Sequence, residues 1–416
     1  MKTRGEIREL IFDWNRENQE LFVPSEPIEF DDETLRDGLQ SPSVHDPSIE
    51  EKLEILHLIG DLGIHSANIG LPGAGARAEA DALRLAQEIA REGMDIFPNC
   101  AARTMVRDVE PIVRISQGAG IAVEAATFIG SSPIRLYTED WSVDKLLGYT
   151  EEAVTFAVKN DLPVMYVTED TSRAHPDVLE KLYTTAISCG ARRICIADTV
   201  GHATPTGVRA LVKFVQDVIA KIGVPGVKID WHGHCDRGMA ISNALAAIEA
   251  GVTRVHGTAL SVGERTGNLP LDLLLVNLRL LGWIDNDISK LPLYVQRVSE
   301  TLRVPIPRNY PVFGEDAFRT ATGVHAAAVI KAMHKGDREL ADWVYSGVPA
   351  GMVGREQAID IGPMSGASNV VFWLELRGEE VETALVHAIL DVAKQSKDTL
   401  TDQQIHDVIA RFRDRS

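Results

Sequence analysis

The chain is poor in cysteine, in basic residues and in long apolar runs, and each shortage excludes a class of protein. Its four cysteines are scattered without paired spacing, so we expect neither a disulfide framework nor a thiolate zinc site. The 60 Asp and Glu residues outnumber the 42 Lys and Arg residues, for a formal net charge of -18. We expect no nucleic-acid partner, because binding phosphates requires clustered cations. We also expect no membrane partner, because no apolar run approaches the roughly 18 residues of a membrane helix.

The N-terminal segment lacks the apolar centre of a signal peptide. Residues 1–18 alternate charges with isolated apolar side chains, which predicts a surface amphipathic helix within an N-terminal helical extension over residues 1–25. A cytoplasmic location is therefore the expectation, and a reducing compartment suits the unpaired cysteines.

What the chain does contain is an alternation of short strand-like runs with segments of helical spacing. The eight strand-like runs lie at residues 28–30, 66–71, 95–98, 121–129, 163–167, 193–197, 227–231 and 254–259. The helical segments between them lie at residues 50–62, 78–92, 143–159, 177–188, 204–222 and 238–250. Eight alternations predict an α/β fold of the (β/α)8 TIM-barrel type. A doubly wound sheet is the rival, but it usually carries a glycine-rich turn after its first strand, which is absent here.

A change of pattern after Leu281 marks a domain boundary. A proline-rich stretch follows at Val304 to Pro311, and helical spacing returns at residues 382–396 and 402–412. We therefore predict a catalytic barrel over residues 26–285 and a linker with a small, mostly helical C-terminal subdomain over residues 286–416. The second part is too short and too helical to be an independent enzyme domain.

Polar residues gather at the predicted C-terminal ends of the strands, where such barrels hold their active sites. An alternating pair, His232 and His234, ends strand seven and puts two imidazoles on one face, which is a metal-ligand geometry. The other polar residues at strand ends are Arg36, Asp37, Asn68, Arg103, Glu169, Asp170, Asp198, Thr199 and Asn268. For Glu169, Asp170 and Asp198, helix capping is the alternative role.

With these residues in place, the chain resembles the DRE-TIM metallolyase superfamily, and within it the Claisen-condensing branch of isopropylmalate, homocitrate and citramalate synthases. The motifs that carry the resemblance are Glu33-Thr34-Leu35-Arg36-Asp37-Gly38-Leu39-Gln40, Glu169-Asp170-Thr171-Ser172-Arg173, Asp198-Thr199-Val200-Gly201, His232-Gly233-His234 and Gly263-Glu264-Arg265-Thr266-Gly267-Asn268. The resemblance implies that Asp37, His232 and His234 hold a divalent metal with Asn268 in or near its shell. Zn, Mn, Co and Mg all suit these ligands.

The activity that the resemblance implies joins an acyl-CoA, probably acetyl-CoA, to a 2-oxo acid and then hydrolyses the thioester. Arg36 would stabilise the developing alkoxide, and His325 with Tyr345 or Glu169 would supply the base. The expected substrate-binding residues are Gln40, Asn68, Arg103, Ala126 and Thr199, of which Thr199 would hold the substrate carboxylate.

The second unit also carries the resemblance. Thr322-Gly323-Val324-His325 looks like the family's Ser-Gly-Ile-His, and Tyr345 stands upstream of Val353-Gly354-Arg355 as the family tyrosine does. This favours synthase over lyase, and it implies a homodimer in which each C-terminal subdomain reaches the partner's barrel. A packing or capping role at a helix start is the alternative for His325.

Three positions depart from the family pattern. Asn68 stands where glutamate is usual, Ala126 where histidine is usual, and Cys235 where asparagine is usual. These changes make the expected pocket less charged and roomier, which favours a 2-oxo acid other than that of the leucine pathway. The chain ends at Ser416 without a long regulatory segment, so we do not expect leucine inhibition.

Two other functions stay open at this level. A metal-dependent carbon-carbon lyase or aldolase of the same superfamily uses the same ligands, although His325 and Tyr345 weigh against it. A catalytically silent metal-binding homologue is the second alternative, which the retention of Arg36, Asp37 and Glu169 disfavours.

Overall fold

The computed structural model describes residues 9–15, 17 and 22–414. The described residues form two compact units, one of residues 22–305 and one of residues 306–414 together with residues 9–15 and 17. None of the helices in the described ranges is both long enough and apolar enough to cross a membrane.

The first unit is a closed barrel of eight parallel strands in sequence order, as predicted. The strands are β1 (Glu29–Asp32), β2 (Ser66–Asn68), β3 (Phe97–Arg103), β4 (Glu124–Gly130), β5 (Val164–Glu169), β6 (Arg193–Asp198), β7 (Lys228–Gly233) and β8 (Arg254–Gly257). The first strand closes the barrel by pairing with both β2 and β8, and Asp31 lies opposite His256 in this register. All strand C-termini therefore meet at one end of the barrel.

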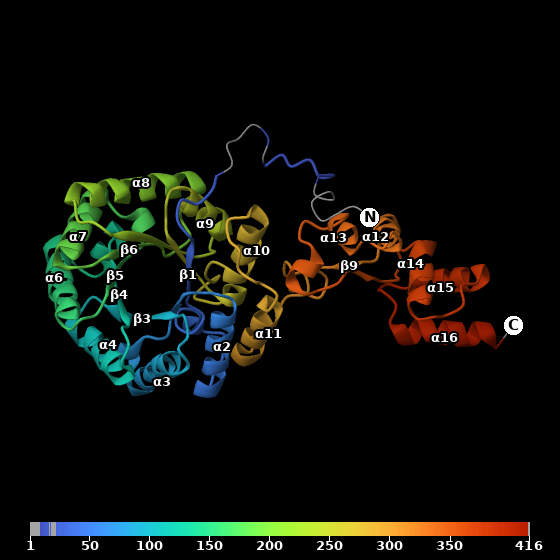
Figure 1. Ribbon diagram of the computed structural model, residues 1–416, viewed down its shortest axis with the longest axis horizontal. Coiled ribbons are helices and arrows are strands. Elements are labelled where there is room, and N and C mark those ends of the chain that lie inside the picture. The colour runs from blue at the N-terminus through green and yellow to red at the C-terminus, as the bar shows by residue number, and fades with distance from the viewer. Residues whose placement is uncertain (1–8, 16, 18–21, 415–416) are drawn as a thin grey trace. The chain divides into compact units, whose positions relative to one another are not determined.

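Helices form a ring around the strands (Figure 1). They are α2 (Ile49–Asp61), α3 (Ala76–Glu92), α4 (Val106–Ala119), α5 (Pro133–Thr138), α6 (Val143–Lys159), α7 (Pro176–Cys189), α8 (Pro205–Ile222), α9 (Ala240–Glu249), α10 (Leu271–Leu281) and α11 (Leu291–Leu302). Local sequence sets their ends. Ser48 and Glu51 form a reciprocal capping box at the start of α2, and Gly93 ends α3 in the left-handed conformation.

Two features of this unit differ from the sequence-based expectation. Helices α4, α5, α10 and α11 are not among the helical segments named from the sequence, and α4 holds Pro111 inside it, a residue that usually ends helices. The compact unit also extends to Pro305, so α11 belongs with the barrel; its Tyr294 and Val298 are fully buried. Most of the expected N-terminal helix lies outside the described residues, and residues 9–15 form turns and irregular chain.

The second unit is mostly helical, as expected. Its helices are α12 (Gly323–His334), α13 (Arg338–Trp343), α14 (Ala367–Leu376), α15 (Thr383–Gln395) and α16 (Asp402–Arg413), and a short parallel pair joins β9 (Arg319–Thr320) to β10 (Ala358–Ile359). Apolar faces of α14, α15 and α16 share a core around Leu374, Ile389 and Ile405. Helix α12 packs in a smaller cluster of its own with α13 and β10.

Candidate metal centre and active site

Three predicted metal ligands converge at the C-terminal end of the barrel. His232 lies near the end of β7, His234 follows that strand, and Asp37 follows β1. The two imidazole Nε2 atoms are 3.1 Å apart, and they lie 3.5 Å and 3.6 Å from Asp37 Oδ2. All three side chains are buried. The spacing of the three ligand atoms suits one ion between them.

The ionisation of these groups also suits a cation. Burial, with His232 alongside, lowers the pKa of His234 to about 4, so its imidazole is neutral near pH 7 and keeps a lone pair. Burial raises the pKa of Asp37, but Arg36 and the two histidines outweigh burial and leave that pKa below its usual value. Neutral imidazole and ionised carboxylate are the forms that bind metals.

Asn268 completes the cluster from the loop after β8. Its amide nitrogen donates to Asp37 Oδ2, while its buried Oδ1 has no hydrogen-bond partner. Gly263 and Gly267 allow this placement: both have positive φ, and a Cβ at Gly263 would lie 2.1 Å from Asn268 Oδ1. The unpartnered amide oxygen, beside one carboxylate and two imidazoles, is a donor set that a divalent cation fits.

Two site residues, Glu33 and Arg36, surround this cluster on the β1 side. Arg36 donates from Nη1 to Asp37 Oδ1 at 2.8 Å and from Nη2 to Glu33 Oε1 at 2.7 Å. Glu33 Oε2 lies 2.9 Å from His232 Nδ1, on the side of the ring away from the cluster. Sequence reasoning assigned no role to Glu33, although its position three residues before Arg36 in the same motif was a signal that the two could pair.

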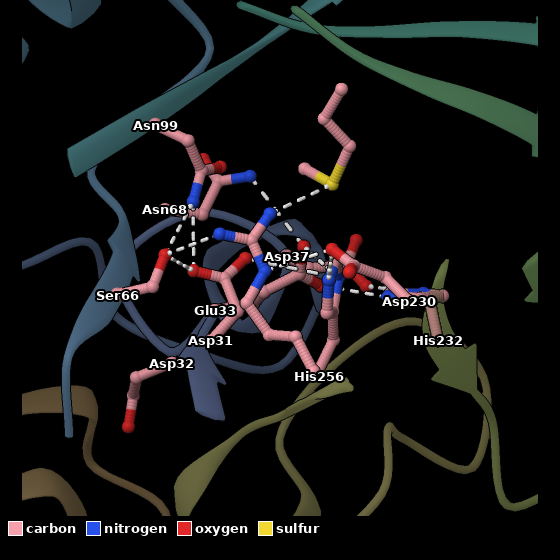
Figure 2. A network of polar contacts seen from close by, with 12 residues as sticks. Asp31, Asp32, Glu33, Asp37, Ser66, Asn68, Asn99, Asp230, His232 and His256 are labelled. Carbon is pink, nitrogen blue, oxygen red and sulfur yellow. Dashed lines mark hydrogen bonds and ion pairs between the residues drawn. The ribbon is translucent and has the colours of Figure 1, made fainter. Parts of the chain in front are cut away.

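Below the cluster, buried charged residues line the barrel interior. His256 on β8 lies 3.0 Å from Asp230 Oδ2 through Nε2 and 3.4 Å from Glu33 Oε1 through Nδ1 (Figure 2). Burial lowers the pKa of His256, but Asp31, Asp230 and Glu33 outweigh burial and raise it to about 10. His256 is therefore a cation at neutral pH and has no lone pair for a metal.

Arg254 occupies the next layer toward the N-terminal end of the barrel. It donates to Glu124 Oε2 at 2.6 Å, to Asp230 Oδ2 at 2.8 Å and to Ser66 Oγ at 3.2 Å. Sequence reasoning missed this network as well. Its signal was the alternation of Arg254 with His256 along a strand, since alternate residues share one face.

Two other predicted residues, Glu169 and Thr199, line a pocket of about 270 Å³. Burial raises the pKa of Glu169. Thr199 Oγ1 accepts the backbone N–H of Asp170 at 2.8 Å, which leaves the hydroxyl proton free to donate. The complete lining is Ile134, Arg135, Thr138, Glu169, Asp170, Arg173, Thr199 and Val200.

The two aspartates of these strand ends bind loop groups and do not cap a helix: Asp170 makes no side-chain capping hydrogen bond, and the N-cap of α8 is Thr204. Asp198 accepts the backbone N–H groups of His202 and Ala203, and Asp170 forms a bidentate pair with Arg173, both distances being 2.7 Å. These carboxylates hold loops in place.

The remaining predicted barrel residues lie outside the metal cluster. Arg103 pairs with Asp108 at the start of α4, and Gln40 is exposed at the end of a 3-10 turn. Ala126 packs against Met165 and Cys195 in an apolar layer of the interior. The space beside this alanine is thus filled by neighbouring core side chains.

The two other departures from the family pattern lie beside the cluster. Asn68 Nδ2 lies 3.5 Å from Glu33 Oε1, and the reverse orientation of its amide places its oxygen 3.2 Å from Arg36 Nε. Cys235 Sγ contacts the backbone oxygen of Asn268 at 3.1 Å, so it supports the loop that holds the fourth ligand.

In the C-terminal unit, the structure brings His325 and Tyr345 together. Their rings stack with centroids 4.2 Å apart and an interplanar angle of 27°. Both side chains are exposed, and Tyr345 retains 50% of its accessible surface. His325 lies in the first turn of α12, whose N-cap residue is Thr322. The stacked, exposed pair favours a role in binding or catalysis over a packing role.

Comparison with known proteins agrees with this geometry. The HMGL-like family model matches residues 27–298. The chain is 33% identical to homocitrate synthase AksA of Methanopyrus kandleri over 398 residues, which cover 94% of each protein. It is 30% identical to the probable 2-isopropylmalate synthase of Ignicoccus hospitalis over 97% of this chain and 96% of that protein.

A solved structure shares the barrel fold. The HMG-CoA lyase of Bacillus subtilis superposes with a TM-score of 0.58 and 20% identity, covering 69% of this chain and 97% of that chain. At this identity the likeness concerns the fold alone. From the family match and the long synthase-type relatives, the chain belongs to the HMGL-like, or DRE-TIM, family and to its Claisen-condensing branch.

Proposed function

We propose that this protein catalyses a metal-dependent condensation of acetyl-CoA, or a similar acyl-CoA, with a 2-oxo acid, followed by hydrolysis of the thioester. The observation that carries the proposal is the convergence of Asp37, His232 and His234 beside the Arg36 guanidinium at the end of the barrel. The names of the homocitrate and 2-isopropylmalate synthase relatives support the same reaction class. The products are CoA and a 2-substituted malate.

Asp37, His232, His234 and Asn268 would hold a divalent cation, which would supply Lewis-acid polarisation to the ketone of the 2-oxo acid. Zn, Mn, Co and Mg are the candidates. Arg36 uses only part of its five N–H donors on Glu33 and Asp37. Its other donors are available to the ketone oxygen, where negative charge develops as the carbon-carbon bond forms.

Residues of the neighbouring pocket orient the substrate and move the proton. The Thr199 hydroxyl donates to the substrate carboxylate. The base removes a proton from the thioester methyl group; Glu169 is one candidate because burial raises its pKa toward the working range. The resulting enolate carbon bonds to the ketone carbon, and the new alkoxide takes up a proton. Water then attacks the thioester carbonyl, and CoA leaves as the thiol.

We propose that His325 and Tyr345 provide the second candidate base, and that they act in the barrel of the partner subunit of a homodimer. Histidine titrates near neutrality, so it can accept a proton from a weakly acidic methyl group and return it. The stacking of the two exposed rings supports a shared role.

The test is release of free CoA thiol by purified protein with Mg, Mn, Co or Zn, acetyl-CoA and a panel of 2-oxo acids, including bulky and dicarboxylic ones. We expect thiol release that depends on one acid and on the metal. Silence with every acid and acyl donor, together with cleavage of a 2-hydroxy acid or its thioester, would replace the proposal with a lyase function.

Two variants connect this activity to the metal cluster. Asp37→Ala and His234→Ala each remove one ligand, and each should abolish metal-dependent thiol release. His202→Ala is the matched control, because His202 follows β6 at the same end of the barrel but has an exposed side chain. Full activity in either ligand variant contradicts the assignment of the metal site.

A further inference from the structure

Glu33 lies between Arg36 and His232, two residues of the candidate site. It follows β1 directly and is 2% exposed. One carboxylate oxygen accepts from Arg36 Nη2 at 2.7 Å, and the other lies 2.9 Å from His232 Nδ1. Figure 2 shows Glu33 between the strands that carry Asn68 and His256. The two oxygens therefore serve two functional groups at once.

Glu33 also belongs to a second possible ligand group, with His232 and His256. That group is a poor metal site, because both ring nitrogens of His256 face carboxylates. Nε2 is 3.0 Å from Asp230 Oδ2, and Nδ1 is 3.4 Å from Glu33 Oε1 and 3.7 Å from Asp31 Oδ2. A carboxylate near each nitrogen favours a proton on both, and a ring that is protonated on both nitrogens offers no lone pair. Glu33 therefore faces the His256 cation on this side. Its position suits orienting neighbouring side chains better than binding a metal ion.

The contact between Glu33 and His232 determines which ring nitrogen of His232 carries the proton. The other nitrogen keeps the lone pair. A carboxylate at Nδ1 retains the proton there, and the lone pair is then on Nε2. Nε2 is the atom that lies 3.1 Å from His234 Nε2 and 3.5 Å from Asp37 Oδ2. The same carboxylate fixes one edge of the Arg36 guanidinium, whose other edge is bound to Asp37.

Asn68, one of the three departures from the family pattern, lies beside Glu33. The usual glutamate at the end of strand two is Asn68 in this sequence, and Asn68 Nδ2 lies 3.5 Å from Glu33 Oε1. In the reverse amide orientation its oxygen lies 3.2 Å from Arg36 Nε. Positions 33 and 68 therefore face the same guanidinium from neighbouring strands.

We propose that Glu33 is a positioning residue that holds His232 in its metal-binding tautomer and clamps Arg36, and that it compensates for the carboxylate missing at Asn68. The effect of Glu33 on metal binding follows from its contacts with His232 and Arg36 and does not depend on the proposed function. The half that concerns Arg36 rests on the proposed function, because Arg36 is needed there for turnover.

The experiment moves the carboxylate from position 33, which follows β1, to position 68 at the end of β2. The variants are Glu33→Gln, Asn68→Glu and the double variant that carries both changes. Binding of Co(II) and Zn(II) to each purified protein is measured by titration calorimetry, with the visible spectrum of Co(II) as a second readout. Thiol release gives kcat and KM separately, and circular dichroism checks the fold.

We expect Glu33→Gln to weaken metal binding by about 10- to 100-fold, the usual effect of losing an outer-shell partner, and to lower kcat more than it changes KM. An amide cannot accept from both donors, since one of its two ends is itself a donor. Asn68→Glu alone should also weaken binding, because it places a second negative charge beside Glu33. The double variant should regain most of the lost affinity, and a merely structural role for Glu33 predicts no such rescue.

Metal affinity within twofold of wild type in well-folded Glu33→Gln overturns the proposal, and so does a double variant no better than Glu33→Gln. If Glu33→Gln fails to fold, the metal affinity of Glu33→Asp is measured in its place. The shorter side chain keeps the charge but withdraws it from His232, so unchanged metal affinity in Glu33→Asp also overturns the proposal. Wild-type protein that binds metal but releases no thiol contradicts the proposed function, while the metal titrations still test Glu33.

Discussion

At the scale of single residues, the contact between Tyr294 and Asp32 connects α11 to the end of β1. The Tyr294 hydroxyl donates to Asp32 Oδ2 and lies 3.0 Å from Thr34 Oγ1, and both Tyr294 and Asp32 are fully buried. Burial raises the pKa of Asp32 to about 6, while the hydrogen bonds from Tyr294 and Thr34 oppose that rise. The raised pKa means that the folded state binds this proton more tightly than the unfolded state.

The stabilisation from that proton is complete below pH 4 and is lost as the pH rises through about 6. At higher pH, Tyr294 stabilises the buried carboxylate. We therefore expect Tyr294→Phe to lower the free energy of unfolding by about 2 kcal/mol at pH 8, the usual size for a hydrogen bond to a charged group. At pH 5 the loss should be smaller, because Asp32 is then largely protonated.

Urea unfolding of wild type and Tyr294→Phe at both pH values measures the difference. Tyr137→Phe is the control, since that side chain is exposed. A loss that is equal at pH 5 and pH 8 contradicts the ionisation of Asp32 as its cause.

The convergence of the candidate metal ligands could be predicted from the sequence motifs and from the resemblance that they carry. The His232-Gly233-His234 alternation at a strand end and the motif around Asp37 both place side chains by short-range rules, and the structure brings these groups within 3.6 Å. The parts of the network that involve Glu33, His256 and Arg254 could not be predicted in the same way. Their partners come from other strands, and the barrel register, not the local sequence, decides which charges meet.

At the scale of elements, buried ion pairs hold the strands together from inside. Arg254 on β8 bonds Glu124 on β4 and Asp230 on β7, and Arg193 on β6 also pairs with Asp230 at 2.6 Å. Arg254 is 1% exposed. Removing one partner from such a network leaves charges buried without compensation, which costs more than the network itself contributes.

Arg254→Met should therefore destabilise the barrel by about 3–5 kcal/mol. Arg209→Met is the matched control, because Arg209 pairs with Glu249 on the surface between α8 and α9, and exposed pairs contribute about 1 kcal/mol or less. Chemical denaturation of the two variants gives both values. Equal destabilisation by the two changes contradicts the structural role of the interior network.

The elements themselves follow closely from hydrophobic period and capping residues. All eight strands overlap the runs that predict them, although β3 shares only residues 97–98 with its predicted run and continues to Arg103, and the helix over Val143–Lys159 has its predicted bounds. The exceptions have physical causes. Pro111 weakens the sequence signal for α4, but the helix buries Val109, Pro111 and Ile112, and tertiary packing outweighs the local signal there.

At the scale of the whole molecule, the candidate residues are divided between two compact units. Asp37 and His232 belong to the barrel, whereas His325 and Tyr345 belong to the C-terminal unit. The sequence motifs indicate that these residues work together, but local pattern cannot specify which subunit supplies each set. Mixing two inactive variants distinguishes the possibilities.

We expect His325→Ala and Asp37→Asn to be inactive separately and to recover about a quarter of wild-type activity after denaturation and refolding together, because random pairing makes about half of the dimers mixed. Each mixed dimer then has one barrel with intact ligands that receives an intact C-terminal unit from its partner. The readout is thiol release, with refolded wild type and the two refolded single variants as references. No recovery in verified mixed dimers contradicts exchange between subunits.

The place of Arg254 on the last strand also has a consequence for synthesis of the chain. Its bonds reach Glu124 and Ser66, which precede it by 130 and 188 residues. While the ribosome is still making the chain, Glu124 lacks the close contact with Arg254, and Asp230 has Arg193 but not Arg254 beside it. A partly synthesised barrel would have to bury these carboxylates with part of their counter-charge missing, so the native interior assembles only after the eighth strand has emerged. Fragments that stop before Arg254 should therefore depend on chaperones or be degraded.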